Sequence, residues 1–186
     1  MTCLIKIAVT LAMLFTLIPA AVYGQSMVLA QAAGTATESL MAALKGKVPS
    51  DIQLLEDLAL TKPGTGVPPQ LSALSGAWSV KLYSERNGSF QADFVYVFEK
   101  VASDSVTIVS MGIGRDPGSR SGGGGNMGTI WSTRYEDLRP IRVTPLEMKN
   151  TRGTLYTFEL NPDGTLKVRT VGSGSPWSGT ARKIAP

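Results

Sequence analysis

The chain has 186 residues, of which 18 are Lys or Arg and 14 are Asp or Glu, so its formal net charge is +4. The basic residues are spread along the sequence and form no runs, which argues against a nucleic-acid partner. There is no histidine and the single cysteine is Cys3, which excludes Ser-His-Asp and Cys-His triads and the usual zinc sites. We therefore expect no metal and no cofactor.

Residues 1–24 have the layout of a secretory signal peptide: Lys6, an apolar run, and then small and polar residues. Cleavage after Gly24 is preferred, and cleavage after Ala32 is the alternative. The apolar run is at the short end of what a membrane span requires, so we expect export to a periplasm or the cell exterior and no stable span after cleavage. The exported chain would contain no cysteine, which favours a bacterial source.

The stretch 25–60 begins as a polar leader and then contains two capping-box patterns, in which a Ser or Thr stands three residues before a Glu or Gln. They predict a helix over 36–46 and a second short helix running from Ser50 toward Ala59. Helices this short are marginal unless their apolar side packs on something. We expect them to pack on their own domain, with docking on a partner as the alternative.

Residues 61–73 contain several Pro and Gly residues and break every periodicity, which is typical of a linker. The linker would separate the helices from the remaining domain, 74–186. We therefore expect a chain that begins at Gln70 to fold by itself.

From 74 onward apolar residues alternate with polar ones, and turn signals recur. This pattern predicts a mainly β domain of eight short antiparallel strands, closed as an up-and-down barrel or, alternatively, stacked as a sandwich. The expected strands are one that carries Trp78, Val80 and Leu82, and then Phe90–Phe98, Val106–Met111, Thr129–Glu136, Ile141–Met148, Thr154–Leu160, Thr165–Val171 and Ser178–Ile184.

Gly76-x-Trp78 on the first strand, with Arg182 on the last, resembles the signature of the lipocalin- and avidin-like, or calycin-type, barrels. The resemblance favours the barrel and implies that the tryptophan plugs one end while the arginine packs across its ring. A partly desolvated cation over an indole contributes roughly 2 kcal/mol. No counterpart of the avidin ligand-contacting residues is present, so the resemblance implies no particular ligand.

Four aromatic residues stand at alternate strand positions that could face a barrel interior: Tyr96, Trp131, Tyr135 and Tyr156. Aromatic walls with polar tips suit sugars, lipids or flat small molecules. The alternative role is core packing, which is the more common one in small barrels that fill their interior with side chains.

The segment 112–128 is rich in glycine and contains Arg115 and Arg120. Backbone with so few side chains could wrap a ligand, and the two arginines could hold an anion. The segment does not have the sequence of a phosphate-binding P-loop. The simpler interpretation is a flexible connection between two strands.

Paired carboxylates are the only common catalytic device left to this chain. Glu136 and Asp137 are adjacent and would point to opposite faces of a strand. The other candidates could meet only through tertiary folding; they are Glu85, Asp93, Glu99 and Glu159. We therefore do not expect an enzyme, and a carboxylate-dependent hydrolase is a remote alternative.

The function predicted from the sequence is that of an exported, non-enzymatic β-barrel. It would bind a small molecule, a glycan or another component of the cell envelope. The alternative from another class is a protein–protein interaction module, in which the N-terminal helices or the 112–128 segment dock onto an envelope protein.

Overall fold

The structure is a computed structural model, and it describes residues 40–114 and 129–186. The expected signal peptide, the start of the first expected helix, Arg115 and Arg120 lie outside the described residues.

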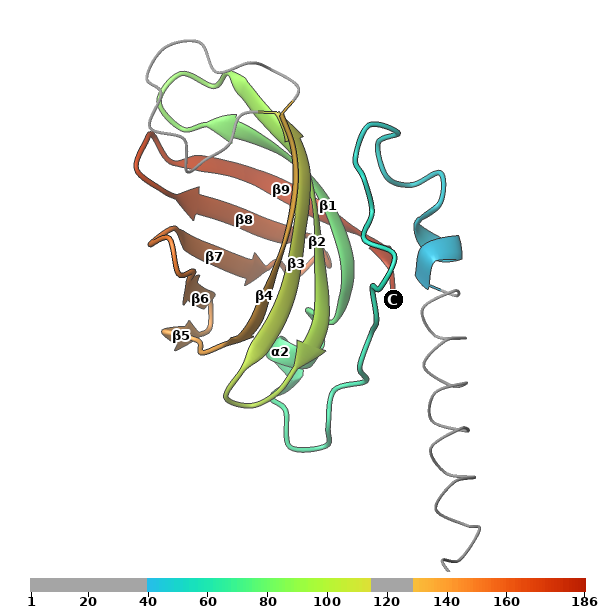
Figure 1. Ribbon diagram of the computed structural model, residues 1–186. Helices are drawn as coiled ribbons and strands as arrows, with labels where there is room; N and C mark the ends of the chain where they lie inside the picture. Colours follow the sequence, from blue (N-terminus) through green and yellow to red (C-terminus); the bar gives the residue numbers. More distant parts are fainter. Residues whose placement is uncertain (1–39, 115–128) are drawn as a thin grey trace, which may run out of the picture.

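The described residues from Gly76 onward form one antiparallel sheet of nine strands, with the order β4-β3-β2-β1-β9-β8-β7-β6-β5. The sheet is strongly curled, as Figure 1 shows. The strands are β1 (Gly76–Ser84), β2 (Phe90–Val101), β3 (Val106–Gly114), β4 (Thr129–Leu138), β5 (Arg142–Val143), β6 (Leu146–Lys149), β7 (Leu155–Leu160), β8 (Leu166–Val171) and β9 (Trp177–Ala185).

The first and last strands, β1 and β9, are paired, as an up-and-down barrel requires. The prediction of a mainly β, antiparallel, barrel-like fold is therefore confirmed, and the sandwich alternative is wrong because the described strands all belong to a single sheet. The closed eight-stranded barrel is also wrong. Within the described residues no strand pairing joins β4 to β5. These two strands are therefore the two edges of the sheet, and the barrel is open between them.

The ninth strand arises where one strand was expected over Ile141–Met148. Val143 pairs with Leu146, and the residues between them, Thr144 and Pro145, form a tight turn. Proline has no N–H to donate to a strand ladder and is favoured in turns. The segment therefore folds as the hairpin β5–β6.

The two faces of the sheet are covered by different parts of the chain. The concave face carries the larger core, which includes Trp78, Phe94, Tyr96, Phe98 and Phe158. The outer face carries a second cluster, in which residues of β1 to β3 pack against the segment 40–60. Strands β2 and β3 are therefore buried on both faces, which explains their nearly continuous apolar sequences.

The segment 40–60 is helical only over 40–44, and the helix expected from Ser50 toward Ala59 is wrong: residues 51–59 form turns, a bend and irregular chain. Ile52 and Leu58 are buried against the outer face of the sheet. The backbone N–H of Thr61 donates to the carbonyl of Glu99 at 2.6 Å. Long-range packing and hydrogen bonding to the sheet thus override a weak local helix signal.

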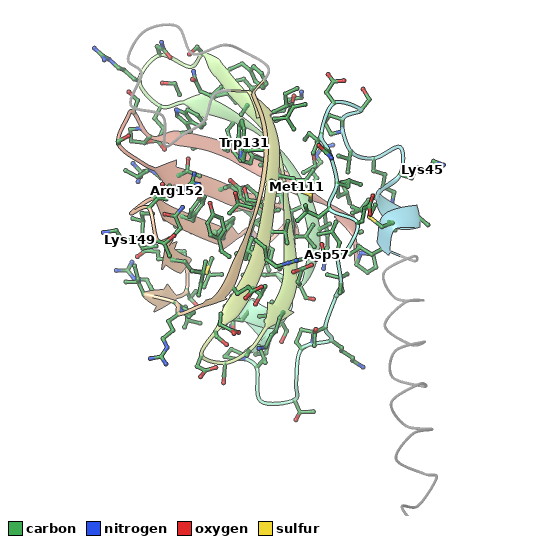
Figure 2. All side chains as sticks on the ribbon, in the orientation of Figure 1. Lys45, Asp57, Met111, Trp131, Lys149 and Arg152 are labelled. Carbon is green, nitrogen blue, oxygen red and sulfur yellow. The ribbon has the colours of Figure 1, made fainter. Side chains whose placement is uncertain are left out.

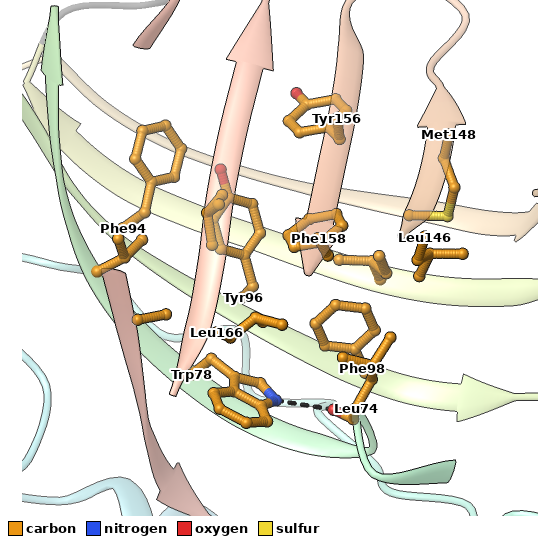
Figure 3. Packing of buried hydrophobic residues seen from close by; sticks show 14 of the residues in the cluster. Leu74, Trp78, Phe94, Tyr96, Phe98, Leu146, Met148, Tyr156, Phe158 and Leu166 are labelled. Atoms are coloured by element: carbon orange, nitrogen blue, oxygen red, sulfur yellow. Dashed lines mark hydrogen bonds between the residues drawn. The ribbon is translucent and has the colours of Figure 1, made fainter. Parts of the chain in front are cut away.

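One end of the open barrel is plugged by α2 (Pro69–Ser72; Figure 1) and by Trp78, which packs with Leu71 and Leu74. Leu71 and Leu74 are buried beside this ring, and the Trp78 indole N–H donates to the carbonyl of Leu74 at 2.7 Å (Figure 3). The predicted role of Trp78 as an end plug agrees with this arrangement.

The predicted partner of Trp78 is wrong. In the β1–β9 pairing Trp78 lies opposite Lys183, while Arg182 lies opposite Ser79 on the outer face. The Lys183 ammonium stands 5.5 Å from the centre of the indole ring. A register change of one residue moves a side chain to the other face of a sheet, and here the pairing shifts between Ala77 and Trp78.

Gly76 is required by its surroundings and not by the tryptophan. Its φ is +111°, and an added Cβ would lie 2.5 Å from the backbone of Pro186. Both the left-handed conformation and the close approach exclude a side chain. Gly76 therefore allows β1 to begin directly against the end of β9.

None of the helices in the described part of the chain is both long and apolar enough to cross a membrane.

Candidate functional site

The predicted aromatic residues do lie on the concave face. Tyr96 and Tyr156 are buried, and Figure 3 shows their rings in the same cluster as Phe94 and Phe158. Trp131 packs edge-on against Phe94 with 5.0 Å between ring centres. The four predicted residues are therefore brought to one interior.

Trp131 reaches Phe94 because β3 has a glycine at the position between them. A Cβ on Gly112 would lie 2.9 Å from the Trp131 ring and 3.0 Å from the Phe94 ring. Gly112 and Gly114 belong to β3, so the first residues of the predicted glycine-rich loop are strand. The close packing of these rings needs that glycine.

The interior next to the tyrosines is almost filled. A cavity of about 10 Å³ lies between β2, β3 and β4 on one side and β6 and β7 on the other, lined by Tyr96, Ile108, Ser110, Tyr135, Leu138, Met148, Tyr156 and Phe158. A cavity of this size holds about one water molecule, whereas ligand pockets usually measure roughly 300–1,000 Å³. In this conformation the aromatic lining is packed core.

Asn150 brings polar groups to the edge of this core. Its side-chain oxygen accepts hydrogen bonds from the backbone N–H groups of Arg152 and Thr154. Its amide nitrogen therefore points inward, and it lies 3.3 Å from the Tyr135 hydroxyl and 3.5 Å from the Tyr156 hydroxyl. The turn after β6 thus holds an N–H donor against two phenols.

Burial raises the pKa values of Tyr96 and Tyr156 well above the usual value, and neighbouring phenols raise them further. The tyrosines of the unfolded chain ionise near pH 10. A raised pKa in the folded state means that the stability from these groups is fully present below about pH 10 and is lost as the pH rises above that value.

We therefore expect urea denaturation midpoints to fall between pH 8 and pH 11, and to fall less in Tyr96→Phe, which has one fewer buried phenol to ionise. Circular dichroism at both pH values measures this. An equal fall in the variant and the parent chain would show that Tyr96 does not contribute.

An ion-pair network ties the N-terminal segment to the outer face. Arg134 contacts the Asp57 carboxylate at 2.6 and 3.0 Å and the Glu99 carboxylate at 2.8 and 3.1 Å. Glu99 is buried, and it also accepts from the backbone N–H of Ala59. Hydrogen bonds from Arg134 lower the pKa of Asp57. The guanidinium therefore joins β2, β4 and the segment 40–60, which covers the outer face of the sheet and is called the covering segment.

Among the described residues, five of the six carboxylates considered as catalytic candidates lie beside cations, and the sixth, Glu136, is exposed and has no ion pair. The pairs are Glu85 with Arg169, Asp93 with Lys81, Glu99 with Arg134, Asp137 with Lys100 and Glu159 with Lys167. Neighbouring cations favour the ionised form of a carboxylate. This arrangement suits surface ion pairs and the ion pairs that hold the N-terminal segment on the sheet better than it suits proton transfer.

A larger hollow lies on the outer face, at residues for which the sequence predicts no site. This outer groove has a volume of about 910 Å³ and is bounded by the segment 46–49 on one side and by β1, β2 and β9 on the other. Its lining residues are Gly46, Lys47, Val48, Pro49, Ser79, Val80, Lys81, Tyr83, Asp93, Gly179, Thr180, Arg182 and Ile184.

The charges of the outer groove are predominantly positive, with three cations and one carboxylate. Lys81 is paired with Asp93 at 2.9 Å, and the Lys47 ammonium donates to the carbonyl of Ile184 at 2.8 Å. Arg182 is exposed and has no ion pair among residues 40–114 and 129–186. Its guanidinium is the cation most available to a ligand.

No protein-family model matches this chain, and no curated protein matches it significantly. Among solved structures, the chain is similar to a de novo designed fluorescence-activating β-barrel, at 16% identity and a TM-score of 0.44, over 63% of this chain and 99% of the design. It is also similar to a redesigned β-barrel, at 15% identity and a TM-score of 0.43, over 64% of this chain and 98% of the other.

These similarities are weak, so the assignment of an open barrel rests on the strand pairing of this chain. The only signal in the sequence for the outer groove is the alternation of Thr180, Arg182 and Ile184 on one side of β9. The basic residues of the groove come from β1, β9 and the segment 46–49, so no local motif brings them together.

Proposed function

We propose that this protein is an exported, non-enzymatic binding protein that holds an anionic ligand in the outer groove. The ligand would be a small molecule, or part of an envelope glycan or lipid headgroup, that carries a carboxylate or phosphate. The observation that carries this proposal is the groove of about 910 Å³ with three cations and one carboxylate in its wall. That volume is within the usual range for ligand pockets.

Of the three cations in the groove, two already have hydrogen-bond partners in the protein, and this supports binding of an anion at the third, Arg182. Lys81 and Lys47 already make hydrogen bonds to the protein, whereas Arg182 projects from the outer face of β9. A guanidinium can donate two parallel hydrogen bonds to one carboxylate or phosphate.

The rest of the lining indicates what else the ligand contains. Val48, Pro49 and Ile184 offer apolar surface, and Ser79 and Thr180 offer hydroxyl groups. An anionic group attached to an apolar or hydroxyl-bearing body matches this mixture.

The alternative function, a protein–protein interaction module, is less well supported for the N-terminal segment as the docking element. Leu40, Leu44, Ile52 and Leu58 are buried against the protein's own sheet, so these apolar side chains are not free to dock on a partner. Most of the 112–128 segment lies outside the described residues.

Native mass spectrometry of protein purified from its own host tests the proposal. The parent chain should retain an anionic small molecule or glycan fragment, and Arg182→Glu should weaken its retention roughly 10- to 100-fold, as expected for the loss of a charge-assisted hydrogen bond. Extraction with and without detergent distinguishes a lipid headgroup from a soluble anion.

Arg152→Glu is the matched control. Arg152 is exposed and lies across the molecule from the segment that carries Lys45 (Figure 2), so this reversal changes the net charge equally without touching the groove. Equal retention by Arg182→Glu and the parent chain, or an equal loss in both variants, would contradict the groove as the site. N-terminal sequencing of the same material should find a start near Gln25 or Ala33 if the protein is exported.

A further inference from the structure

Among residues 40–114 and 129–186, two buried hydroxyl groups on the concave face have no hydrogen-bond partner, those of Tyr96 and Thr170. Each of these residues is only 1% exposed. Ser110 is close enough to Tyr96 to influence its pKa, but the Tyr96 hydroxyl makes no hydrogen bond of acceptable geometry to Ser110 or to any other described residue. Unpaired buried polar groups are uncommon and costly, so these two hydroxyls need an explanation.

The two hydroxyls belong to a group of polar side chains that share one region of the interior. Thr170 pairs with Tyr156 across β7 and β8, and the ring of Tyr156 contacts both Tyr96 and Tyr135. Asn150 directs its amide nitrogen at Tyr135 and Tyr156, at the long distances of 3.3 and 3.5 Å. Every one of these groups can donate a hydrogen bond, and none is charged.

This region lies at the gap in the sheet. The small cavity beside Tyr96 is lined from one side by Tyr135 and Leu138 of β4 and from the other by Met148 of β6 and Tyr156 of β7. No strand pairing crosses from β4 to β5 or β6 in the part of the chain that the structure describes. Side-chain contacts alone close the cavity there, so separating the two edges breaks no hydrogen bond between strands.

We propose that the gap between β4 and β6–β7 is the entrance to a second binding site, for a small uncharged molecule with a carbonyl or ether oxygen on an apolar body. The oxygen would accept hydrogen bonds from Tyr96 and its neighbours. The apolar body would replace contacts now made among Ile108, Leu138, Met148 and Phe158. Tyr135 is half-buried on the edge strand β4 and moves aside to admit the ligand.

The chemical class follows from the lining. A charged ligand is disfavoured because none of the described residues that line the cavity is charged and an ion in an apolar site is costly. An acceptor is favoured because the phenols remain protonated donors, since burial raises the pKa values of Tyr96 and Tyr156.

Methyl NMR of the full chain, with acetophenone as probe, tests this site. The Met148 and Ile108 methyl signals should shift saturably, and ethylbenzene, which has nearly the same shape but no oxygen, should bind more weakly. Tyr96→Phe should weaken acetophenone binding roughly 3- to 10-fold and leave ethylbenzene binding unchanged within about twofold. Tyr135→Ala should speed the exchange of both probes.

The same variants show which results would overturn the site. Tyr96→Phe removes an unpartnered hydroxyl, so its melting temperature should be no lower than that of the parent chain; a clear fall would show that the hydroxyl is already bonded. The proposed site would also be overturned if acetophenone caused no saturable methyl shift in the parent chain and none in Tyr135→Ala. Equal affinity of Tyr96→Phe and the parent chain for acetophenone would overturn it as well. Arg182→Glu should leave acetophenone binding unchanged, so this site and the outer groove can fail independently.

Discussion

A chain that begins at Gln70 should fail to form a stable fold, because it lacks the segment that covers the outer face of the sheet. That segment buries Leu40, Leu44, Ile52 and Leu58 almost completely. Burial of one such side chain contributes about 1.5–3 kcal/mol, so the four together contribute about 6–12 kcal/mol. The total stability of a domain this size is about 5–15 kcal/mol.

The loss has a second component on the sheet itself. Without the segment, the outer faces of β2 and β3 would expose Val95, Val97, Val109 and Met111. A contiguous apolar patch of this kind promotes aggregation. The structure thus changes the expectation, drawn from the Pro and Gly residues of 61–73, that the part from Gln70 onward folds alone.

Circular dichroism, urea denaturation and size-exclusion chromatography measure this effect, on the chain from Gln70 and on a control chain. A chain that begins at Leu40 is the control, because it keeps the four leucine and isoleucine contacts. If the chain from Gln70 remains monomeric, with a β-rich spectrum and the same urea midpoint as the control, the covering segment is not part of the core.

Replacing Trp78 by alanine should lower the free energy of unfolding by about 3–5 kcal/mol, as large truncations in a core do. Trp78 is 1% exposed and packs beside Leu71 of α2 at the plugged end of the open barrel. The substitution also removes the hydrogen bond to the carbonyl of Leu74. Urea denaturation of the single variant measures the loss.

A double-mutant cycle identifies the cation that acts on Trp78. Residues in contact show coupling energies of roughly 0.5–3 kcal/mol, whereas distant ones are additive within about 0.5 kcal/mol. We expect coupling between Trp78→Ala and Lys183→Ala, because the ammonium lies 5.5 Å from the ring. Arg182→Ala is the control and should be additive. Coupling to Arg182 in place of Lys183 would contradict the observed register of β1 and β9.

The positions of most strands follow from the sequence alone. Alternation of apolar and polar residues and the turn residues around Asn87-Gly88 and Asn161–Gly164 depend only on neighbouring residues. These local signals place the strands to within a few residues of β1, β2, β3, β7 and β8. They also account for the aromatic side of the sheet, because residues two apart in a strand share a face.

The locations of the sites were decided by tertiary structure. The register shift between Ala77 and Trp78 turns Arg182 outward and Lys183 inward. The missing pairing between β4 and β5 places Tyr135 and Tyr156 on either side of a gap. Neither feature has a local signature, because a bulge and an unpaired edge are properties of two strands and not of one.

The packing of the covering segment also depends on residues that are distant in the sequence. Its capping-box pattern at Ser50 predicts a helix, but Ile52 and Leu58 are buried against a sheet face formed by residues distant in the sequence, from Ala77 to Ala185. The outer groove exists only because this segment docks beside β1 and β9. Local sequence therefore determines which residues can form strands, whereas the register, the gap and the groove depend on free energies of contact between distant segments, which no short stretch of sequence contains.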